Sequence, residues 1–115
     1  MSAPKPSRGE VWTVDLDPVR GHEQGGVRPA LVVSVDAFNH SPADLVIIVP
    51  LTTRARPLRS RIPVDPPEGG VVQRSFIMCE MVRSIAHDRL GRRWGAVSTP
   101  TFAQVEDCLR ILLGL

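Results

Sequence analysis

Short apolar runs, separated by turns rich in glycine and proline, extend along most of the chain and predict a mainly β domain. The run at 10–16 alternates between polar and apolar residues, which is typical of a strand with one buried face. The run at 29–35 is almost wholly apolar and predicts a strand buried on both faces. The most apolar strand is predicted at 44–53. Later strands are predicted at 62–64, 71–82, 83–86 and 93–97.

The end of the chain carries the one clear helical pattern. Thr99 is a suitable N-cap and Pro100 suits the first helical position. Apolar residues then recur at helical spacing, which predicts a helix that packs on the core. These residues are Phe102, Val105, Leu109, Leu112 and Leu113. A single helical turn is expected at 36–41, capped by Asp36. Short strands closed by one helix indicate a small β-barrel or a strongly bent sheet.

A length of 115 residues favours one domain with an ordinary hydrophobic core. Residues 1–7 predict a disordered tail, and 8–115 a single domain. No signal peptide is recognised, and no run approaches the ~20 apolar residues that a membrane span needs, so we expect a soluble cytoplasmic protein. Cys79 and Cys108 lie in apolar runs and are expected to be reduced, buried thiols.

The basic residues are unevenly placed, although the net charge is only +2. Thirteen of the 14 are arginines. Four fall in one predicted loop, at positions 54, 56, 59 and 61. Arginine has a planar fork of donors that suits phosphate recognition. The loop therefore indicates either a phosphate-binding surface or a solvated segment of an arginine-rich chain.

Several kinds of site are excluded by their missing motifs. The sequence has no Walker-type phosphate loop, no dinucleotide-binding fingerprint and no nucleophile elbow. Its two cysteines lie far apart and lack a neighbouring Cys or His pair, which argues against a zinc site. We therefore expect no metal and no cofactor.

Three stretches, taken in order, resemble the MazF/PemK (Kid) family of toxins. The first stretch runs from 8 to 34 and includes Gly21-His22-Glu23-Gln24 and Arg28-Pro29. The second is Val49-Pro50-Leu51-Thr52-Thr53, and the third begins at Cys79-Glu80 and ends ahead of the final helix. The resemblance covers nearly all of 8–115, and its specificity lies in the order and spacing of the motifs.

The resemblance implies a small SH3-like β-barrel with a C-terminal helix that works as a homodimer. It also implies a toxin of a type II toxin–antitoxin system that acts as a metal-independent endoribonuclease. Such a toxin cuts single-stranded RNA at short motifs and stops translation. Its cognate antitoxin would neutralise it by laying an acidic, otherwise disordered tail over the RNA groove.

Site residues follow from the same motifs. The resemblance implies that Arg28 is the essential arginine, which would act as acid or charge stabiliser, and that Thr52 contacts the phosphate. The proton acceptor remains open among His22, Glu23 and Glu80, and Glu80 is expected inside a strand, where it could instead pair with Arg74 or Arg83. The expected catalytic residues are His22, Arg28, Thr52 and Glu80. The expected RNA-binding residues are Glu23, Gln24, Thr53, Arg54, Arg56 and Arg83.

Two alternatives stay open. The Kid-type members carry an arginine where this chain has Met78, which favours a different acid–base arrangement or an RNA-binding relative that does not cleave. The second alternative is a toxin of the same fold that poisons DNA gyrase by binding, as CcdB does. That mode depends on an aromatic-containing C-terminal tail, whereas this chain ends Leu113-Gly114-Leu115.

Overall fold

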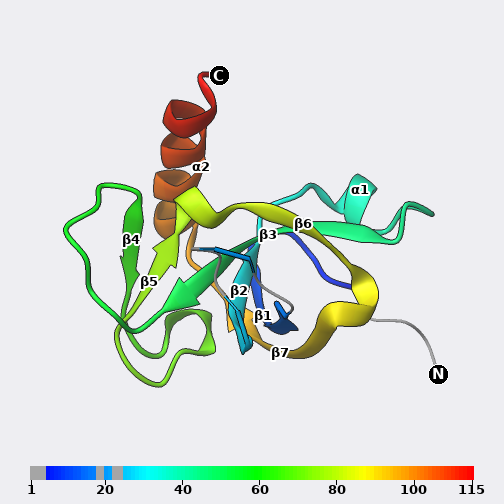
Figure 1. The fold of residues 1–115 in the computed structure, drawn as a ribbon, viewed down its shortest axis with the longest axis horizontal. Helices are drawn as coiled ribbons and strands as arrows, with labels where there is room; N and C mark the ends of the chain where they lie inside the picture. Colours follow the sequence, from blue (N-terminus) through cyan, green and yellow to red (C-terminus); the bar gives the residue numbers. More distant parts are fainter. Residues whose placement is uncertain (1–4, 18–19, 22–24) are drawn as a thin grey trace.

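One antiparallel sheet of seven strands forms most of the computed structural model, which describes residues 5–17, 20–21 and 25–115 (Figure 1). The strands are β1 (Glu10–Asp15), β2 (Val27–Val32), β3 (Leu45–Thr52), β4 (Arg61–Val64), β5 (Ser75–Met78), β6 (Arg83–Ala86) and β7 (Leu90–Ala96). The sheet order is β4-β5-β3-β2-β1-β7, and β6 pairs with β3 outside this path. The prediction of a mainly β domain with a C-terminal helix is therefore confirmed.

β3 pairs with three other strands of the sheet. One edge of β3 pairs with β2, where Ala30 faces Pro50 and Val32 faces Ile48. The other edge pairs first with β6 and then, at Leu51 and Thr52, with β5. Because two strands share one edge of β3, the sheet bends there, and the end of β3 lies between β2 and β5.

The bent sheet is open within the described residues, since no strand pairing joins the two end strands β4 and β7. The word barrel thus describes its curvature only loosely. Pro63 lies on the end strand β4, as predicted, because proline lacks the N–H group that a central strand would need for pairing.

Alternating side chains of the central strands supply two separate hydrophobic cores. Leu31 and Val49 belong to the core that also holds Val105 of the C-terminal helix. Ala30 and Val32 belong to the second core, beside β6. Neighbouring residues of a strand point to opposite faces, so Ala30, Leu31 and Val32 show that β2 is buried on both faces. The prediction for the apolar run at 29–35 is thus confirmed.

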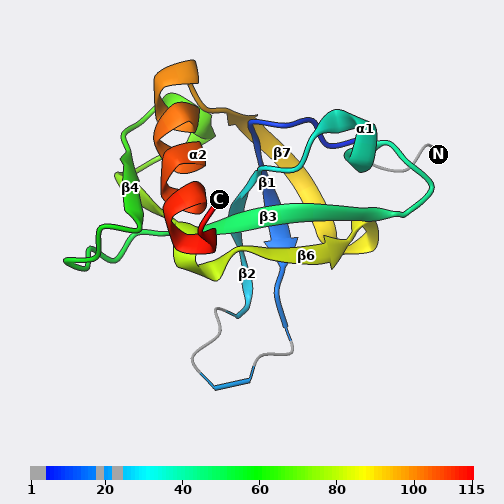
Figure 2. The same cartoon turned by 90° about the horizontal axis from the view of Figure 1, so that it is seen from above.

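The C-terminal helix α2 (Thr99–Leu113) stands at the end of the sheet beside β4 and the turn that joins β5 to β6 (Figures 1 and 2). Its N-cap is Ser98, one residue before the predicted Thr99, and the Ser98 hydroxyl accepts a bond from the Thr101 amide. Gly114 ends the helix with φ 71°, a left-handed conformation that glycine adopts at little cost.

Only part of the predicted apolar face of α2 reaches the core. Val105 is fully buried, and Phe102 and Leu109 pack against the same core. Leu112 and Leu113 are 46% and 57% exposed, so the prediction is wrong for the last turn. The reason is visible in Figure 1, where the end of α2 extends beyond the sheet.

The predicted strand at 71–82 is instead a strand and a turn. Only Ser75–Met78 forms β5, and a 3-10 turn, η2 (Cys79–Met81), follows it. At this turn the chain leaves its pairing with β4 and continues into β6. Glu80 therefore lies in a turn and not in a strand.

The remaining short elements are α1 (Asp36–Asn39), η1 (Glu68–Gly70) and η3 (His87–Arg89). The helical turn at 36–41 is confirmed, but Val35 and not Asp36 is its N-cap. Asp36 Oδ1 accepts instead from the Arg8 amide, which joins the start of the domain to α1. Within the predicted tail 1–7, the structure describes 5–7, where the Ser7 amide donates to Glu10. None of the helices described here is long and apolar enough to cross a membrane.

Candidate functional site

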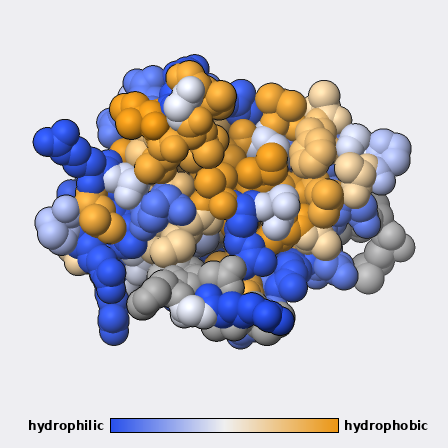
Figure 3. Space-filling view, turned by 45° about the horizontal axis from the view of Figure 1, so that its top comes forward, coloured by the Kyte–Doolittle hydropathy of each residue, from blue (hydrophilic) through white to orange (hydrophobic). Residues whose placement is uncertain are grey.

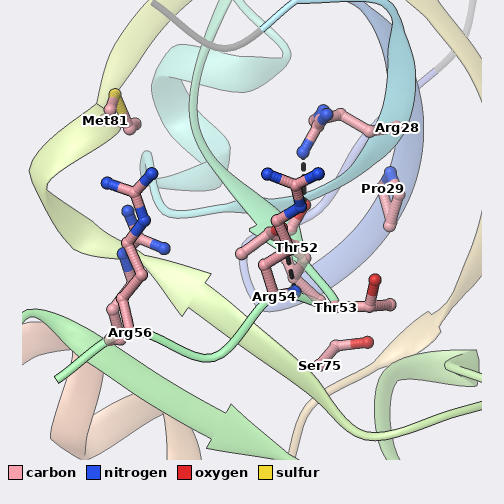
Figure 4. Close-up of a pocket in the computed structure, with 10 residues that line it drawn as sticks. Arg28, Pro29, Thr52, Thr53, Arg54, Arg56, Ser75 and Met81 are labelled. Atoms are coloured by element: carbon pink, nitrogen blue, oxygen red, sulfur yellow. Dashed lines mark hydrogen bonds between the residues drawn. The ribbon is translucent and has the colours of Figure 1, made fainter. Parts of the chain in front are cut away.

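A polar pocket of about 620 Å³ lies where β3 ends (Figure 4). Its wall is formed by residues of β2, β3 and the loop after β3, together with residues of β4, β5 and η2. It is lined by Arg28, Pro29, Leu51, Thr52, Thr53, Arg54, Arg56, Arg61, Ser75 and Met81. Four arginines and no acidic residue lie among the described residues of this wall, so the pocket suits an anionic ligand.

Arg28 lies on β2 and is held by backbone carbonyl groups. Its Nε donates to Gly25 O at 3.1 Å, and its Nη1 donates to Leu51 O at 3.4 Å. Within the described part of the chain, no carboxylate pairs with it. A carbonyl orients the guanidinium without neutralising its charge, so Arg28 remains able to bind an anion.

Thr52 is the last residue of β3, and its Oγ1 accepts a bond from the Arg54 amide at 3.2 Å. The strand-end hydrogen bond to the backbone, expected of any threonine here, is thus present. The hydroxyl still has its own hydrogen to donate, because it only accepts in this bond. Thr52 can therefore orient the loop and also donate to a ligand.

Five of the ten expected site residues lie together at this place. Arg28 and Thr52, which were expected to be catalytic, border the same pocket as Thr53, Arg54 and Arg56, which were expected to bind RNA. Figure 4 shows Arg56 and Met81 on the side of the pocket opposite Arg28 and Pro29.

Glu80 lies beside the pocket, where each of its carboxylate oxygens accepts a hydrogen bond. Arg61 Nε donates to Glu80 Oε2 at 2.7 Å, and the Ser60 hydroxyl donates to Glu80 Oε1 at 2.6 Å. Partial burial raises the pKa of Glu80, but the bonds from Arg61 and Ser60 outweigh it, so that its pKa lies below the usual 4.5. The expectation of an ion pair with Arg83 or Arg74 is wrong, because Arg61 occupies the carboxylate and Arg74 pairs with Asp65.

Among the expected RNA-binding residues that the structure describes, Arg83 alone does not border the pocket. It lies on β6 opposite Ile48, in the half of β3 away from Thr52. His22, Glu23 and Gln24 lie outside the described residues.

Five pocket residues are not among the expected site residues: Pro29, Leu51, Arg61, Ser75 and Met81. The sequence singles out Arg61 only as a member of the arginine-rich stretch that it shares with Arg54 and Arg56, a stretch that indicates either a phosphate-binding surface or a solvated segment. Arg59, from that stretch as well, lies elsewhere, in a groove between β4 and α2 that also includes Ile62, Cys108 and Leu112.

The cysteines are free thiols. Cys79 is fully buried, as predicted, whereas Cys108 is only partly buried. Burial and the neighbouring Cys108 raise the pKa of the Cys79 thiol, which makes it a poor nucleophile. Across the described ranges, no cluster of three or more His, Cys, Asp or Glu side chains could hold a metal ion.

Comparison with known proteins places this pocket in a family context. Residues 7–113 match the family model described as PemK-like, MazF-like toxin of type II toxin–antitoxin system. The chain is 37% identical to endoribonuclease MazF9 of Mycobacterium tuberculosis over 113 residues, which cover 94% of this chain and 96% of that protein. It is 34% identical to endoribonuclease EndoA of Bacillus subtilis over 109 residues, which cover 94% of each.

Solved structures show the same fold. The crystal structure of MazF from Deinococcus radiodurans superposes with a TM-score of 0.87 at 29% identity, covering 97% of this chain and 99% of that one. An endoribonuclease from a mycobacterial species, solved in complex with its cognate antitoxin, superposes with a TM-score of 0.80 at 27% identity, covering 96% of each chain.

Proposed function

Because the chain belongs to the family of PemK-like, MazF-like toxins of type II toxin–antitoxin systems, we propose that it is a metal-independent endoribonuclease that cleaves single-stranded RNA at a short motif. The observation that carries this proposal is the pocket in which Arg28, without a carboxylate partner among the described residues, lies with Thr52. Such a toxin acts in the cytoplasm and stops translation by cutting messenger RNA.

The cleavage uses a nucleophile that the RNA itself supplies. The ribose 2′-oxygen attacks the adjacent phosphorus as its proton passes to a base, and the bond from phosphorus to the 5′-oxygen breaks. The leaving 5′-oxygen takes up a proton, so that the products are a 2′,3′-cyclic phosphate and a 5′-hydroxyl. The phosphorane between them carries extra negative charge, which needs fixed donors.

Arg28 and Thr52 have the chemistry for those donors. A guanidinium offers two parallel N–H groups to a phosphate, and Thr52 adds a hydroxyl hydrogen from the end of a rigid strand. Since both oxygens of Glu80 are already engaged, the base is assigned to His22 or Glu23 of the loop between β1 and β2. Thr53, Arg54 and Arg56 bind the neighbouring RNA backbone.

The same pocket is proposed as the site of neutralisation by an antitoxin. Relatives have been solved with their cognate antitoxin. The four arginines of this pocket attract an acidic peptide as they attract phosphate. An acidic, otherwise disordered antitoxin segment would therefore compete directly with RNA.

The exposed apolar end of α2 supports the proposal of a homodimer. Hydrophobic residues gather over this end of the molecule in Figure 3. The exposed side chains on it are Ile111, Leu112, Leu113 and Leu115. A contiguous apolar surface of this kind is typical of a protein interface.

The proposal is tested by cutting assays on single-stranded RNA in EDTA with wild type and Arg28→Ala. We expect the variant to cut at least about a hundredfold more slowly, since removal of one preorganised donor to a charged transition state has that effect. Arg92→Ala is the matched control, because it removes the same group from an exposed position on β7, outside the pocket.

Equal rates for wild type and Arg28→Ala would remove Arg28 from the site. If wild type leaves RNA intact and inhibits supercoiling by DNA gyrase, the chain is a gyrase-binding toxin. If wild type binds RNA without cutting it, the chain is a non-cleaving relative.

A further inference from the structure

We propose that Arg61 is a second fixed phosphate-binding group of this pocket, and that Glu80 and Ser60 are positioning residues that hold it rather than proton acceptors. This inference rests on the proposed function, because it assigns the residue to the RNA-binding pocket. It concerns an interaction that lies beside the Arg28–Thr52 pair and comes from a different part of the sheet, the edge strand β4.

Burial distinguishes Arg61 from the other arginines of its stretch. Its side chain is only 5% exposed, yet it borders the pocket, whereas Arg54, Arg56 and Arg59 are exposed. An arginine is rarely buried to this degree unless a partner compensates its charge. Arg61 is therefore a fixed part of the pocket wall, not a mobile surface cation.

The partner holds Arg61 from one side and leaves the opposite donors unused. Nε of Arg61 donates to Glu80 Oε2 at 2.7 Å, and Nη2 lies 2.6 Å from the same oxygen. A guanidinium carries five N–H groups. Within the described part of the chain no hydrogen bond engages the Nη1 amino group, which keeps donors for a phosphate.

The backbone keeps this arrangement in register. Arg61 lies directly opposite Met78 in the β4–β5 pairing. The next residue after Met78 fixes the turn, because the Cys79 amide donates to Ser60 O at 3.0 Å. The Ser60 hydroxyl then bonds the second oxygen of Glu80. Both ends of the ion pair are thus anchored to paired backbone, so a phosphate can bind Arg61 without ordering its side chain first.

The same contacts argue against Glu80 as the proton acceptor. Each of its oxygens already accepts a short hydrogen bond, and protonation would break the ion pair with Arg61. Its pKa lies below the usual value. A general base works best when its pKa lies near the operating pH, so a carboxylate whose pKa is lowered and whose two oxygens both accept hydrogen bonds is poorly suited to that role.

The first test measures the binding of a fluorescent pool of short 2′-O-methyl RNA strands, which cannot be cut through the 2′-oxygen, as a function of salt. Arg61→Gln is expected to bind about tenfold or more weakly, because a charge-assisted bond is lost. The slope of log affinity against log salt should become about 0.7 less steep, as loss of one phosphate contact on a single strand predicts. Arg92→Gln, which makes the same charge change at an exposed position on β7, outside the pocket, should keep the wild-type slope.

Arg61→Lys separates charge from geometry. Lysine keeps the positive charge but cannot hold Glu80 side-on while offering a planar fork to phosphate. We expect the wild-type slope with reduced affinity. A residue with a structural role alone would give no such difference between Gln and Lys. A wild-type slope and affinity for Arg61→Gln would overturn the inference.

The second test asks whether Glu80 positions or takes the proton. Glu80→Gln is expected to lower the rate of RNA cutting about tenfold to a hundredfold, since a displaced group of this kind loses its alignment. The acid limb of the pH–rate profile should remain. Abolished cutting together with loss of the acid limb would identify Glu80 as the base and overturn its positioning role.

Folding is controlled with the double variant Arg61→Gln/Glu80→Gln, which replaces the ion pair by two neutral amides and leaves no unpaired charge. It should fold and bind RNA as Arg61→Gln does, and wild-type affinity and slope in it would overturn the inference. A wild-type protein that binds RNA but does not cut it would contradict the proposed nuclease function. The binding experiment would still decide whether Arg61 contacts phosphate.

Discussion

Arg28 and Arg61 border the same pocket, but their charges are balanced in different ways. Arg28 is oriented by two carbonyl groups and has no carboxylate partner among the described residues. Arg61 is buried and shares its charge with Glu80. The first arrangement suits a group that must respond to new negative charge in a transition state, and the second suits a fixed contact.

A residue-scale prediction concerns Glu10, whose carboxylate accepts bonds from the Ser7 amide, Trp12 Nε1 and Arg93 Nε. Partial burial raises the pKa of Glu10, but these bonds outweigh it and hold its pKa below 4.5. The stabilisation is therefore complete above about pH 4.5 and is lost as the pH falls through the lower, folded-state pKa.

We expect Glu10→Gln to lower the free energy of unfolding by about 1 kcal/mol at neutral pH, and by less in acid. Urea unfolding at a series of pH values measures this. Asp107→Asn, which removes an exposed ion pair with Arg110, should have little effect. A Glu10→Gln deficit that stays constant down to strongly acidic pH would show that the ionised carboxylate is not the source.

The sequence singles out Arg28 and Thr52, which border the pocket, because each adjoins an apolar strand within a family motif. It could not find the partner of Glu80. Arg61 lies 19 residues away along the chain, and the two meet only through the β4–β5 register. A contact that depends on register between strands leaves no local signal in the sequence.

At the scale of elements, the limits of the pattern are visible in the segment 71–82. Its apolar residues correctly indicate burial, yet the pairing with β4 ends within it, where β5 gives way to η2. An apolar residue indicates burial, but it does not indicate which strand it packs or pairs with. The central strands were easier to predict, because their continuous apolar runs follow from burial on both faces.

The N-cap of α2 is a second example and leads to a prediction. Ser98 and Thr99 are both suitable caps, and the choice falls on Ser98 because its amide and hydroxyl also donate to Glu68 Oε2, each at 2.8 Å. Ser98→Ala should lower the free energy of unfolding by about 1 kcal/mol.

Thr99→Ala should change stability by much less, since Thr99 is exposed and lies inside the first turn. Thermal unfolding of the two variants side by side measures the difference. Equal losses, or a larger loss for Thr99→Ala, would refute the assignment of the cap.

On the scale of the whole molecule, polar and apolar surfaces are separated. The arginine pocket lies at the end of β3, whereas the apolar surface lies on the last turn of α2. The sequence indicated the apolar spacing of α2 correctly, but not that its end passes beyond the sheet. Whether the last turn is buried depends on the length of the helix relative to the sheet beneath it. The apolar spacing of a helix carries no information about that length of the sheet.

The homodimer proposal makes its prediction at this scale. Ile111 is 81% exposed at the end of α2, and Ile111→Asp should shift the protein from dimer to monomer, because a charge cannot be buried without a partner. Sedimentation velocity measures the change. Val72→Asp is the matched control, since Val72 is 85% exposed on a different segment. A dimer that tolerates Ile111→Asp as it tolerates Val72→Asp would exclude this surface.

We propose above all that the pocket of Arg28 and Thr52 cuts RNA by using the 2′-hydroxyl groups of the RNA as nucleophiles. The most direct test incubates the purified protein with a long single-stranded RNA in EDTA and determines the chemistry of the fragment ends. Discrete cuts at one short motif, with 5′-hydroxyl and 2′,3′-cyclic phosphate ends, are the expected result. Intact RNA, or fragments with 5′-phosphate ends, would contradict the account.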